Sequence, residues 1–210
     1  MLTLENRRLA FLVLATPFFL NDIGFIALDG SYGVYLVDYV TRVFVIFVCF
    51  TWSISRKIIK EKHTTNSRWD LLLFAVIFLP VVGRSLYNLI ELPFVAMTGW
   101  YGLFHFGQIN NFQLYWLDLT IGLFLVALSE ELVFRKLALS WFLKARRPIS
   151  QTVVISACFF SLMHWGSGLG RVLFTFVIGI IYMMAYLKLR KLWPLILAHW
   201  IEDFIGFGPI

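Results

Sequence analysis

Long, predominantly apolar runs recur along the chain and limit its possible folds more than any other feature. Three of them, at residues 9–28, 34–54 and 69–90, reach the roughly 20 residues that a helix needs to cross a bilayer. Only helices and closed β-barrels satisfy their backbone hydrogen bonds in lipid, and the alternating pattern of barrel strands is missing. The chain is 60% hydrophobic and 14% charged, against about a quarter charged in a soluble domain. We therefore expect an all-α polytopic transmembrane helix bundle.

Turn residues and basic clusters divide the chain into about seven expected spans. They are expected at residues 9–28, 34–54, 69–90, 112–143, 149–165, 172–187 and 193–206. Pro148 and Pro194 stand where two of the helices begin, and proline is tolerated in a first helical turn. Because the linkers are short, we expect one integrated bundle without a second soluble domain.

The positive charge of the chain lies between the apolar runs. The net charge is +6, but Lys and Arg cluster in segments such as 55–68 and 144–147, as in cytoplasmic loops. The stretch 91–111 contains neither Lys nor Arg, which is typical of an outer loop. We expect a cytoplasmic N-terminus in an uncleaved first span, contact with the lipid bilayer and no nucleic acid partner. The two cysteines, Cys49 and Cys158, indicate neither a disulfide framework nor a metal site.

Ionisable side chains gather in the later spans, where a charge is costly and usually functional. They are Glu130, Glu131, Arg135, His164, His199, Glu202 and Asp203. At about 1.5 Å of rise per residue, counting from the nearest basic segment places Glu130, His164 and the 199–203 stretch roughly 12 to 24 Å deep. These groups, from three helices, are therefore expected to converge in one layer of the membrane.

The spacing within the first of these helices suggests which groups pair. Glu131 lies four residues before Arg135, the favourable order for an ion pair on one helix face, so this pair is expected to support the site. Glu130 points to a different sector, has no obvious cation and is left to act as a base. Alternatively, both glutamates are simply paired with Arg135 and Lys136.

The last helix offers a second pair. His199 and Asp203 share a helix face at i,i+4, and Glu202 competes with Asp203 for the same role. With Glu130 and His164, these groups suffice to activate a water and stabilise an oxyanion.

Other polar residues within the spans are interpreted as structural. Asp38 and Arg42 are spaced for an i,i+4 ion pair that neutralises both charges. The remaining ones are expected toward the outer ends of their spans: Arg84, Asn88, Glu91 and Asp118.

Three short motifs in the second half of the chain carry a family resemblance. "EELVFR" with Glu130, Glu131 and Arg135, "FSLMH" with Phe160 and His164, and "HWIED" with His199 and Asp203 occur in this order. In motif, order and separation the chain resembles the CPBP intramembrane proteases, also called the CAAX-protease and bacteriocin-processing (Abi) family. The resemblance covers about residues 115–207.

The resemblance implies an intramembrane endopeptidase of glutamic type in the bacterial inner (plasma) membrane. Glu130 and His164 would activate the attacking water, and His199 and Asp203 would stabilise the oxyanion. The supporting residues would be Glu131, Arg135 and Phe160, and Phe160 would pack behind His164. Residues 113–210 would form the catalytic membrane core, preceded by transmembrane spans and an outer loop in residues 1–112. The substrate would be a membrane protein or a lipidated peptide.

The chain departs from the family pattern at Asp203, where the family often has asparagine. An amide donates to an oxyanion, whereas an ionised carboxylate repels it. Either Asp203 is protonated and donates, or it accepts from His199 and fixes the tautomer of that imidazole. We favour the second arrangement.

Two alternatives stay open at this point. Glu130, His164 and His199 together match the ligand set of a catalytic zinc site, but no HExxH helix is present, and a mechanism without a cofactor needs fewer rearrangements. The same buried groups also suit a proton-coupled membrane transporter, or a non-catalytic immunity or scaffold protein on the same fold.

Overall fold

The computed structural model of the chain describes residues 2–61 and 69–208, and within them every regular element is a helix. This confirms the expected all-α bundle. The helices are α1 (Leu4–Ala27), α2 (Gly33–Thr51), α3 (Ser53–Lys60), α4 (Trp69–Leu86), α5 (Leu92–Thr98), α6 (Phe112–Leu117), α7 (Leu123–Glu131), α8 (Ala138–Lys144), α9 (Ile149–Leu162), α10 (Leu169–Leu189) and α11 (Trp193–Phe207). Three π-helical turns interrupt them, η1 (Tyr87–Glu91), η2 (Asp118–Gly122) and η3 (Leu132–Leu137), and a 3₁₀ turn, η4 (Trp165–Ser167), follows α9.

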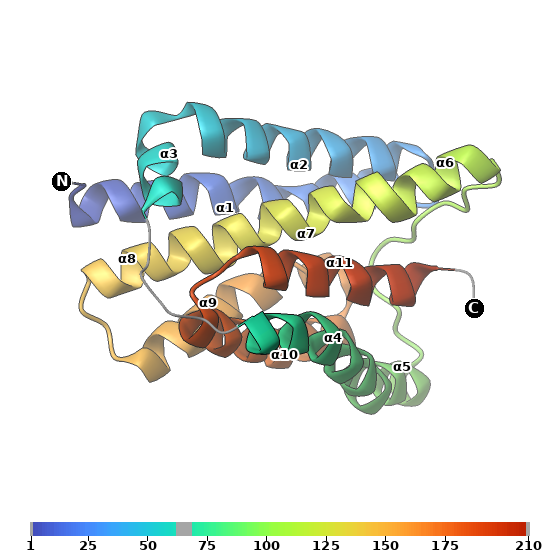
Figure 1. Cartoon of the computed structure of the whole chain (residues 1–210). Helices are drawn as coiled ribbons and strands as arrows, with labels where there is room; N and C mark the ends of the chain where they lie inside the picture. The colour runs from blue at the N-terminus through green and yellow to red at the C-terminus, as the bar shows by residue number, and fades with distance from the viewer. Residues whose placement is uncertain (1, 62–68, 209–210) are drawn as a thin grey trace.

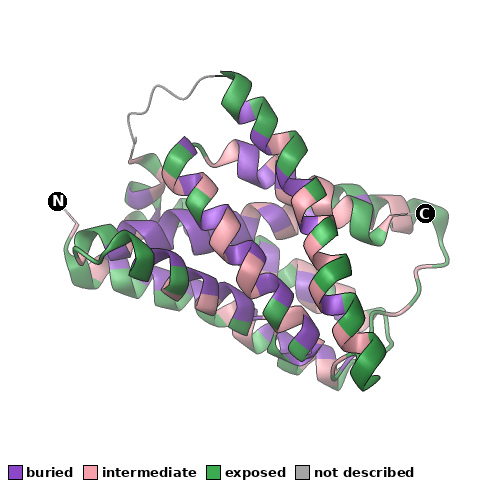
Figure 2. Cartoon of the chain, turned by 90° about the horizontal axis from the view of Figure 1, so that it is seen from below, coloured by how far each residue is buried: buried purple, intermediate pink, exposed green. Residues whose placement is uncertain are grey.

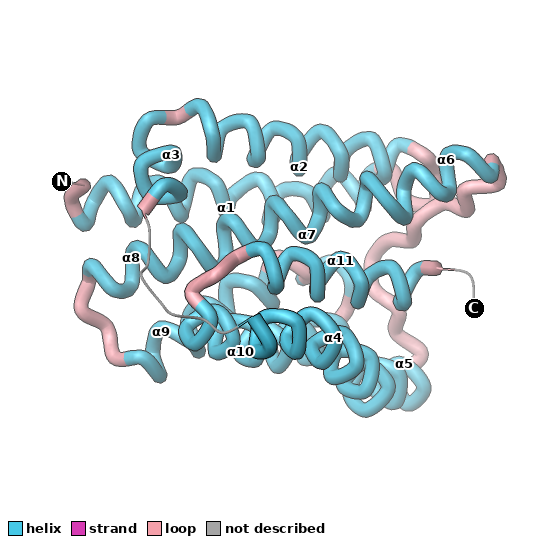
Figure 3. Tube along the Cα trace, viewed as in Figure 1, coloured by secondary structure: helices cyan, strands magenta, loops and turns pink. Residues whose placement is uncertain are grey.

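All seven expected spans are helical, and successive spans run in opposite directions (Figure 1). By length and composition, four helical stretches within the described residues can cross a membrane: Leu4–Ala27, Gly33–Thr51, Trp69–Thr98 and Leu169–Leu189. The tube in Figure 3 shows the connecting loops at the two ends of the bundle. α1 begins at one end and α11 ends at the other, as an odd number of spans requires.

The elements α6, η2, α7, η3 and α8 form one continuous helix from Phe112 to Lys144, called here the central helix. α1, α2 and α11 all pack against it, and every residue from Ser129 to Ser140 is buried. Figure 2 shows the same division across the bundle, with buried positions facing inward and exposed positions facing outward. This enclosure explains how a helix with two glutamates and an arginine can lie within a membrane, because protein and not lipid surrounds its charges.

The end of the bundle where α1 begins differs from the expectation in one respect. The second span ends at Thr51, and α3 then packs against α1 and η3. Glu61, just after α3, accepts a hydrogen bond of 2.8 Å from Arg7, and its carbonyl accepts one of 2.6 Å from Lys136. The alternative in which Lys136 neutralises a glutamate of the central helix is therefore wrong. The expected basic loop at 55–68 lies partly on residues 62–68, outside the described residues.

At the opposite end, residues 99–111 form the loop that crosses the bundle from α5 to α6 (Figure 1). The nitrogen of Leu103 donates to the Gly166 carbonyl at 2.7 Å, and Tyr35 donates to the Gly107 carbonyl at 2.8 Å. Gly102 has a φ of +110° and lies against the backbone of Gly166 and Ser167, where a side chain would collide. This outer loop is therefore fixed to α2 and to the turn after α9.

We predict opposite effects from two glycine substitutions. A β-carbon at Gly83 of α4 would meet the carboxyl of Glu202 on α11, whose Oε2 accepts a 2.9 Å hydrogen bond from Tyr182. Gly83→Ala should therefore cost about 1–3 kcal/mol of stability, or on the order of 5 °C in Tm. Gly206→Ala, where nothing lies within 4 Å, should leave Tm unchanged or raise it, because alanine favours the helix. Thermal unfolding in detergent measures both, and equal shifts would contradict the close α4–α11 contact.

Candidate active site

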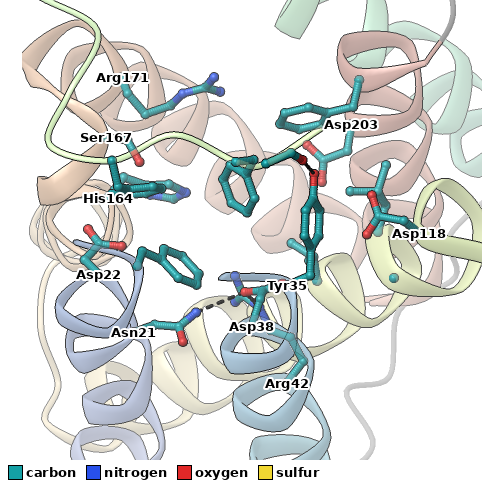
Figure 4. A pocket seen from close by; sticks show the side chains of 18 of the residues that line it. Asn21, Asp22, Tyr35, Asp38, Arg42, Asp118, His164, Ser167, Arg171 and Asp203 are labelled. Atoms are coloured by element: carbon teal, nitrogen blue, oxygen red, sulfur yellow. Dashed lines mark hydrogen bonds and ion pairs between the residues drawn. The ribbon is translucent and has the colours of Figure 1, made fainter. Parts of the chain in front are cut away.

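A cavity of about 630 Å³ lies below the outer loop. Its walls come from α1, α2, the central helix, the α9–α10 turn, α10 and α11, and all four candidate catalytic residues line it: Glu130, His164, His199 and Asp203. Figure 4 shows His164 and Asp203 on opposite sides of this cavity, with Asn21, Asp38 and Arg42 below them in the view. The polar groups of the later spans therefore converge as expected.

Glu130 has a cation after all, and the expectation that it lacks one is wrong. Arg42 of α2 places Nη1 2.8 Å from Glu130 Oε1. The same guanidinium donates from Nε to Asp38 Oδ1 at 3.0 Å, so the expected Asp38–Arg42 pair forms. Arg42 is nevertheless more than a neutralised charge within α2, because it joins that helix to the glutamate across the cavity floor.

His199 is held by Glu131. The Nδ1 of His199 lies 3.1 Å from Glu131 Oε1, and Glu131 Oε2 lies 3.1 Å from Arg135 Nε. The expected Glu131–Arg135 pair thus forms and orients the histidine as well. Because an ionised carboxylate only accepts hydrogen bonds, Nδ1 carries the proton in this contact.

The other nitrogen of His199 faces the cavity. Nε2 lies 3.5 Å from Asp203 Oδ2 and 3.8 Å from Glu130 Oε2, so Glu130, His199 and Asp203 meet at one place. Asp203 is close to His199 as its spacing indicated. The partner that fixes the ring through Nδ1, however, is Glu131.

His164 lies just beyond α9, in the turn before η4, and not within the helical span expected for it. Its Nδ1 lies 3.0 Å from the Phe160 carbonyl. A carbonyl only accepts, so Nδ1 donates and Nε2 is the nitrogen left for other partners. Among the described residues, no hydrogen bond or ion pair joins His164 to Glu130, although both line the same cavity.

The N-terminal helix holds the turn that carries His164. Asp22 of α1 accepts a 2.7 Å hydrogen bond from the nitrogen of Gly166, and Trp165 Nε1 donates to the Phe19 carbonyl at 3.1 Å. Asp22 was not among the predicted site residues, because nothing in its local sequence separates it from an ordinary polar residue at a helix end.

Phe160 connects the two histidines with the supporting arginine. Its ring centroid lies 5.4 Å from that of His164 and 6.3 Å from that of His199. The Arg135 guanidinium lies 4.5 Å from the centroid of the same ring, a favourable cation–π geometry. The expected packing of Phe160 beside His164 is confirmed. Arg135 itself lies in η3, and π-helical turns often occur at functional sites.

Glu202 takes no part in this cluster. It accepts from Tyr182 at 2.9 Å and lies against Gly83 of α4, so it does not compete with Asp203 for His199. The Tyr182 ring centroid lies 5.9 Å from that of His199, which makes this pair part of the packing behind the histidine.

The cavity also contains charges that the sequence indicated only as span ends. Arg171 of α10 pairs with Glu91 at 3.1 Å, and Asp118 accepts a hydrogen bond from Tyr39. Arg171, Glu91 and Asp118 all line the cavity, whereas Arg84 lies over the Tyr87 ring, 5.1 Å from its centroid.

Among the described residues, no three His, Cys, Asp or Glu side chains are grouped so that they could hold a metal ion. The alternative zinc ligand set of Glu130, His164 and His199 lines the cavity. One carboxylate oxygen of Glu130 is beside Arg42, and the other is 3.8 Å from His199.

The chain was compared with protein families, curated proteins and solved structures. Residues 111–205 match the family model described as type II CAAX prenyl endopeptidase Rce1-like. Searches of curated proteins and of solved structures each found no significant match. The matched segment contains Glu130, Glu131, Arg135, Phe160, His164, His199 and Asp203. Residues 111–205 are thus similar to the Rce1-like family of type II CAAX prenyl endopeptidases, in agreement with the resemblance of the chain to the CPBP intramembrane proteases.

Proposed function

We propose that this protein is a glutamic-type intramembrane endopeptidase that hydrolyses a peptide bond of a membrane-associated substrate. The observation that carries the proposal is the meeting of Glu130, His199 and Asp203 in a cavity that His164 also lines. These groups come from the central helix, α11 and the α9–α10 turn. The family match supports a protease independently of this geometry.

In the proposed reaction, Glu130 takes a proton from a water molecule as the water oxygen attacks the carbonyl carbon of the substrate. Oε2 of Glu130 is the oxygen for this step, since Oε1 faces Arg42. His164 lines the same cavity and would orient the same water by accepting its second hydrogen at Nε2. The C–N bond then breaks, and the proton held by Glu130 passes to the leaving amine.

The developing oxyanion needs a hydrogen-bond donor, and His199 is the candidate. A protonated His199 donates from Nδ1 to Glu131 and keeps Nε2–H for the oxyanion. Carboxylates on both sides of the ring, Glu131 at 3.1 Å and Asp203 at 3.5 Å, favour that charged form. Asp203 would then accept from Nε2 until the substrate arrives. This arrangement is compatible with aspartate where the family often has asparagine.

We propose that the reaction needs no metal ion. A guanidinium 2.8 Å from Glu130 Oε1 would repel a divalent cation at that carboxylate.

We propose a cytoplasmic N-terminus and a substrate that reaches the cavity from within the membrane. The end of the bundle where α1 begins holds Arg7, Arg8, Lys57, Lys60 and Lys144, whereas the outer loop contains neither Lys nor Arg. The cavity wall carries the aromatic rings of Phe18, Phe25, Phe104 and Phe106 beside the polar floor. Such a wall suits apolar side chains or a lipid group, and the matching family is described as a CAAX prenyl endopeptidase.

Glu130→Gln should reduce cleavage by about 10²–10⁴-fold, the range for loss of a general base, and leave the protein folded, since glutamine matches glutamate in shape. The measurement compares membranes from cells that make the wild type or the variant, by mass-spectrometric mapping of new peptide termini. Glu5→Gln is the matched control, because Glu5 is exposed, pairs with Arg8 and does not line the cavity. Identical termini in wild-type and Glu130→Gln membranes would rule out the proposed activity.

Cleavage by the purified protein should persist after treatment with 1,10-phenanthroline, because no step passes through a bound metal. The assay follows the substrate identified by terminus mapping, with metal content measured before and after treatment. Activity that disappears on chelation and returns with added zinc would contradict the metal-free mechanism.

A further inference from the structure

Arg42 lies outside the segment that matches the family, yet it contacts the proposed catalytic base. Arg42 and Glu130 are 88 positions apart (130 − 42) and come from α2 and the central helix. Both side chains are buried, with 10% and 2% of their surface exposed. Both also line the cavity, so the pair belongs to the site and not to the packed interior alone.

The guanidinium of Arg42 is itself fixed on several sides. Its Nε donates to Asp38 Oδ1 at 3.0 Å, and the Phe18 ring centroid lies 4.8 Å from its central carbon. Asp38 Oδ1 in turn accepts from Asn21 Nδ2 at 3.0 Å, and Asn21 Oδ1 accepts from Thr41 at 2.9 Å. Residues of α1 and α2 therefore give Arg42 one position and one orientation.

We propose that Arg42 is a positioning residue for the reaction, acting through Glu130. By holding Oε1, the guanidinium directs Oε2 toward His199 and the substrate. It also keeps a permanent positive charge beside the base, because arginine does not lose its proton in proteins. This role rests on the proposed function, since it presupposes that Glu130 activates water.

A purely structural explanation accounts less well for the pair. Replacing a buried ion pair by apolar groups of similar size is often neutral or stabilising, so packing alone does not require two charges here. A base that must remain charged within a membrane does require a partner, and Arg42 provides it at 2.8 Å.

The first test follows cleavage in membranes, with Arg84→Gln as the matched control because Arg84 contacts Tyr87 outside the cavity. Arg42→Gln should cleave about 100-fold more slowly, the scale expected from a misplaced catalytic group. Arg42→Lys keeps the charge and should recover about one tenth or more of wild-type cleavage. Asp38→Asn, which weakens the hold on Arg42 and keeps both Arg42 and Glu130, should slow cleavage about 10-fold at a near-normal Tm. Wild-type cleavage by Arg42→Gln, or by Asp38→Asn if Arg42→Gln does not fold, would overturn the positioning role.

The second test measures the pair without using activity. Thermal unfolding in detergent of Arg42→Gln, Glu130→Gln and the double variant forms a double-mutant cycle. Arg42→Gln should lower Tm by about 6 °C or more because it leaves a buried carboxylate unpaired. The double variant should unfold within about 2 °C of Glu130→Gln alone.

The two tests separate the ways in which these proposals can fail. If wild-type membranes contain no peptide termini beyond those of Glu130→Gln membranes, the proposed function fails, and the positioning role fails with it. If the wild type cleaves but the unfolding losses simply add, the Arg42–Glu130 pair does not form and only the positioning role is overturned.

Discussion

A charged side chain in the interior of a membrane protein needs a partner of opposite charge, and this requirement organises the whole bundle. The partners form a chain of alternating sign from α2 through the central helix to α11. Asp38 contacts Arg42, Arg42 contacts Glu130, and Glu130 faces His199, which Glu131 and Arg135 hold from the other side. The central helix is enclosed by its neighbours because its charges must face protein, and the cavity lies where these charges meet.

The two halves of the chain contribute differently to this site. Glu130, His164, His199 and Asp203 all lie within residues 111–205, the segment that matches the family. Two of the contacts that hold these residues come from helices that precede this segment in the chain. Arg42 of α2 faces Glu130, and Asp22 of α1 fixes the turn after His164. The proposed catalytic residues thus depend on α1 and α2 for their positions.

Patterns local to one helix predicted much of the fold and part of the site. Apolar runs and helix-boundary residues located the helices, and i,i+4 spacing identified the Glu131–Arg135 and His199–Asp203 contacts, because both partners of each pair lie on one helix. The Arg42–Glu130 pair could not be predicted in this way, since it depends on which helices pack together and in what rotation. The same reason applies to His199, whose Nδ1 partner is Glu131 on another helix and not its own neighbour Asp203. His164 lies outside α9 because the chain turns at Met163, and the contacts that fix this turn come from α1, far away in sequence.

The central claim is that side chains from separate helices surround one hydrolytic water. An experimental structure with a bound peptide analogue, in which a hydroxyethylene group replaces the scissile amide and mimics the tetrahedral intermediate, tests it most directly. The account predicts the hydroxyl within about 3 Å of Glu130 Oε2 and His199 Nε2. Arg42 should remain paired with Glu130 Oε1, and His164 should face the analogue from the cavity wall. An analogue bound outside this cavity, or a Glu130 carboxyl turned toward the acyl chains, would contradict it.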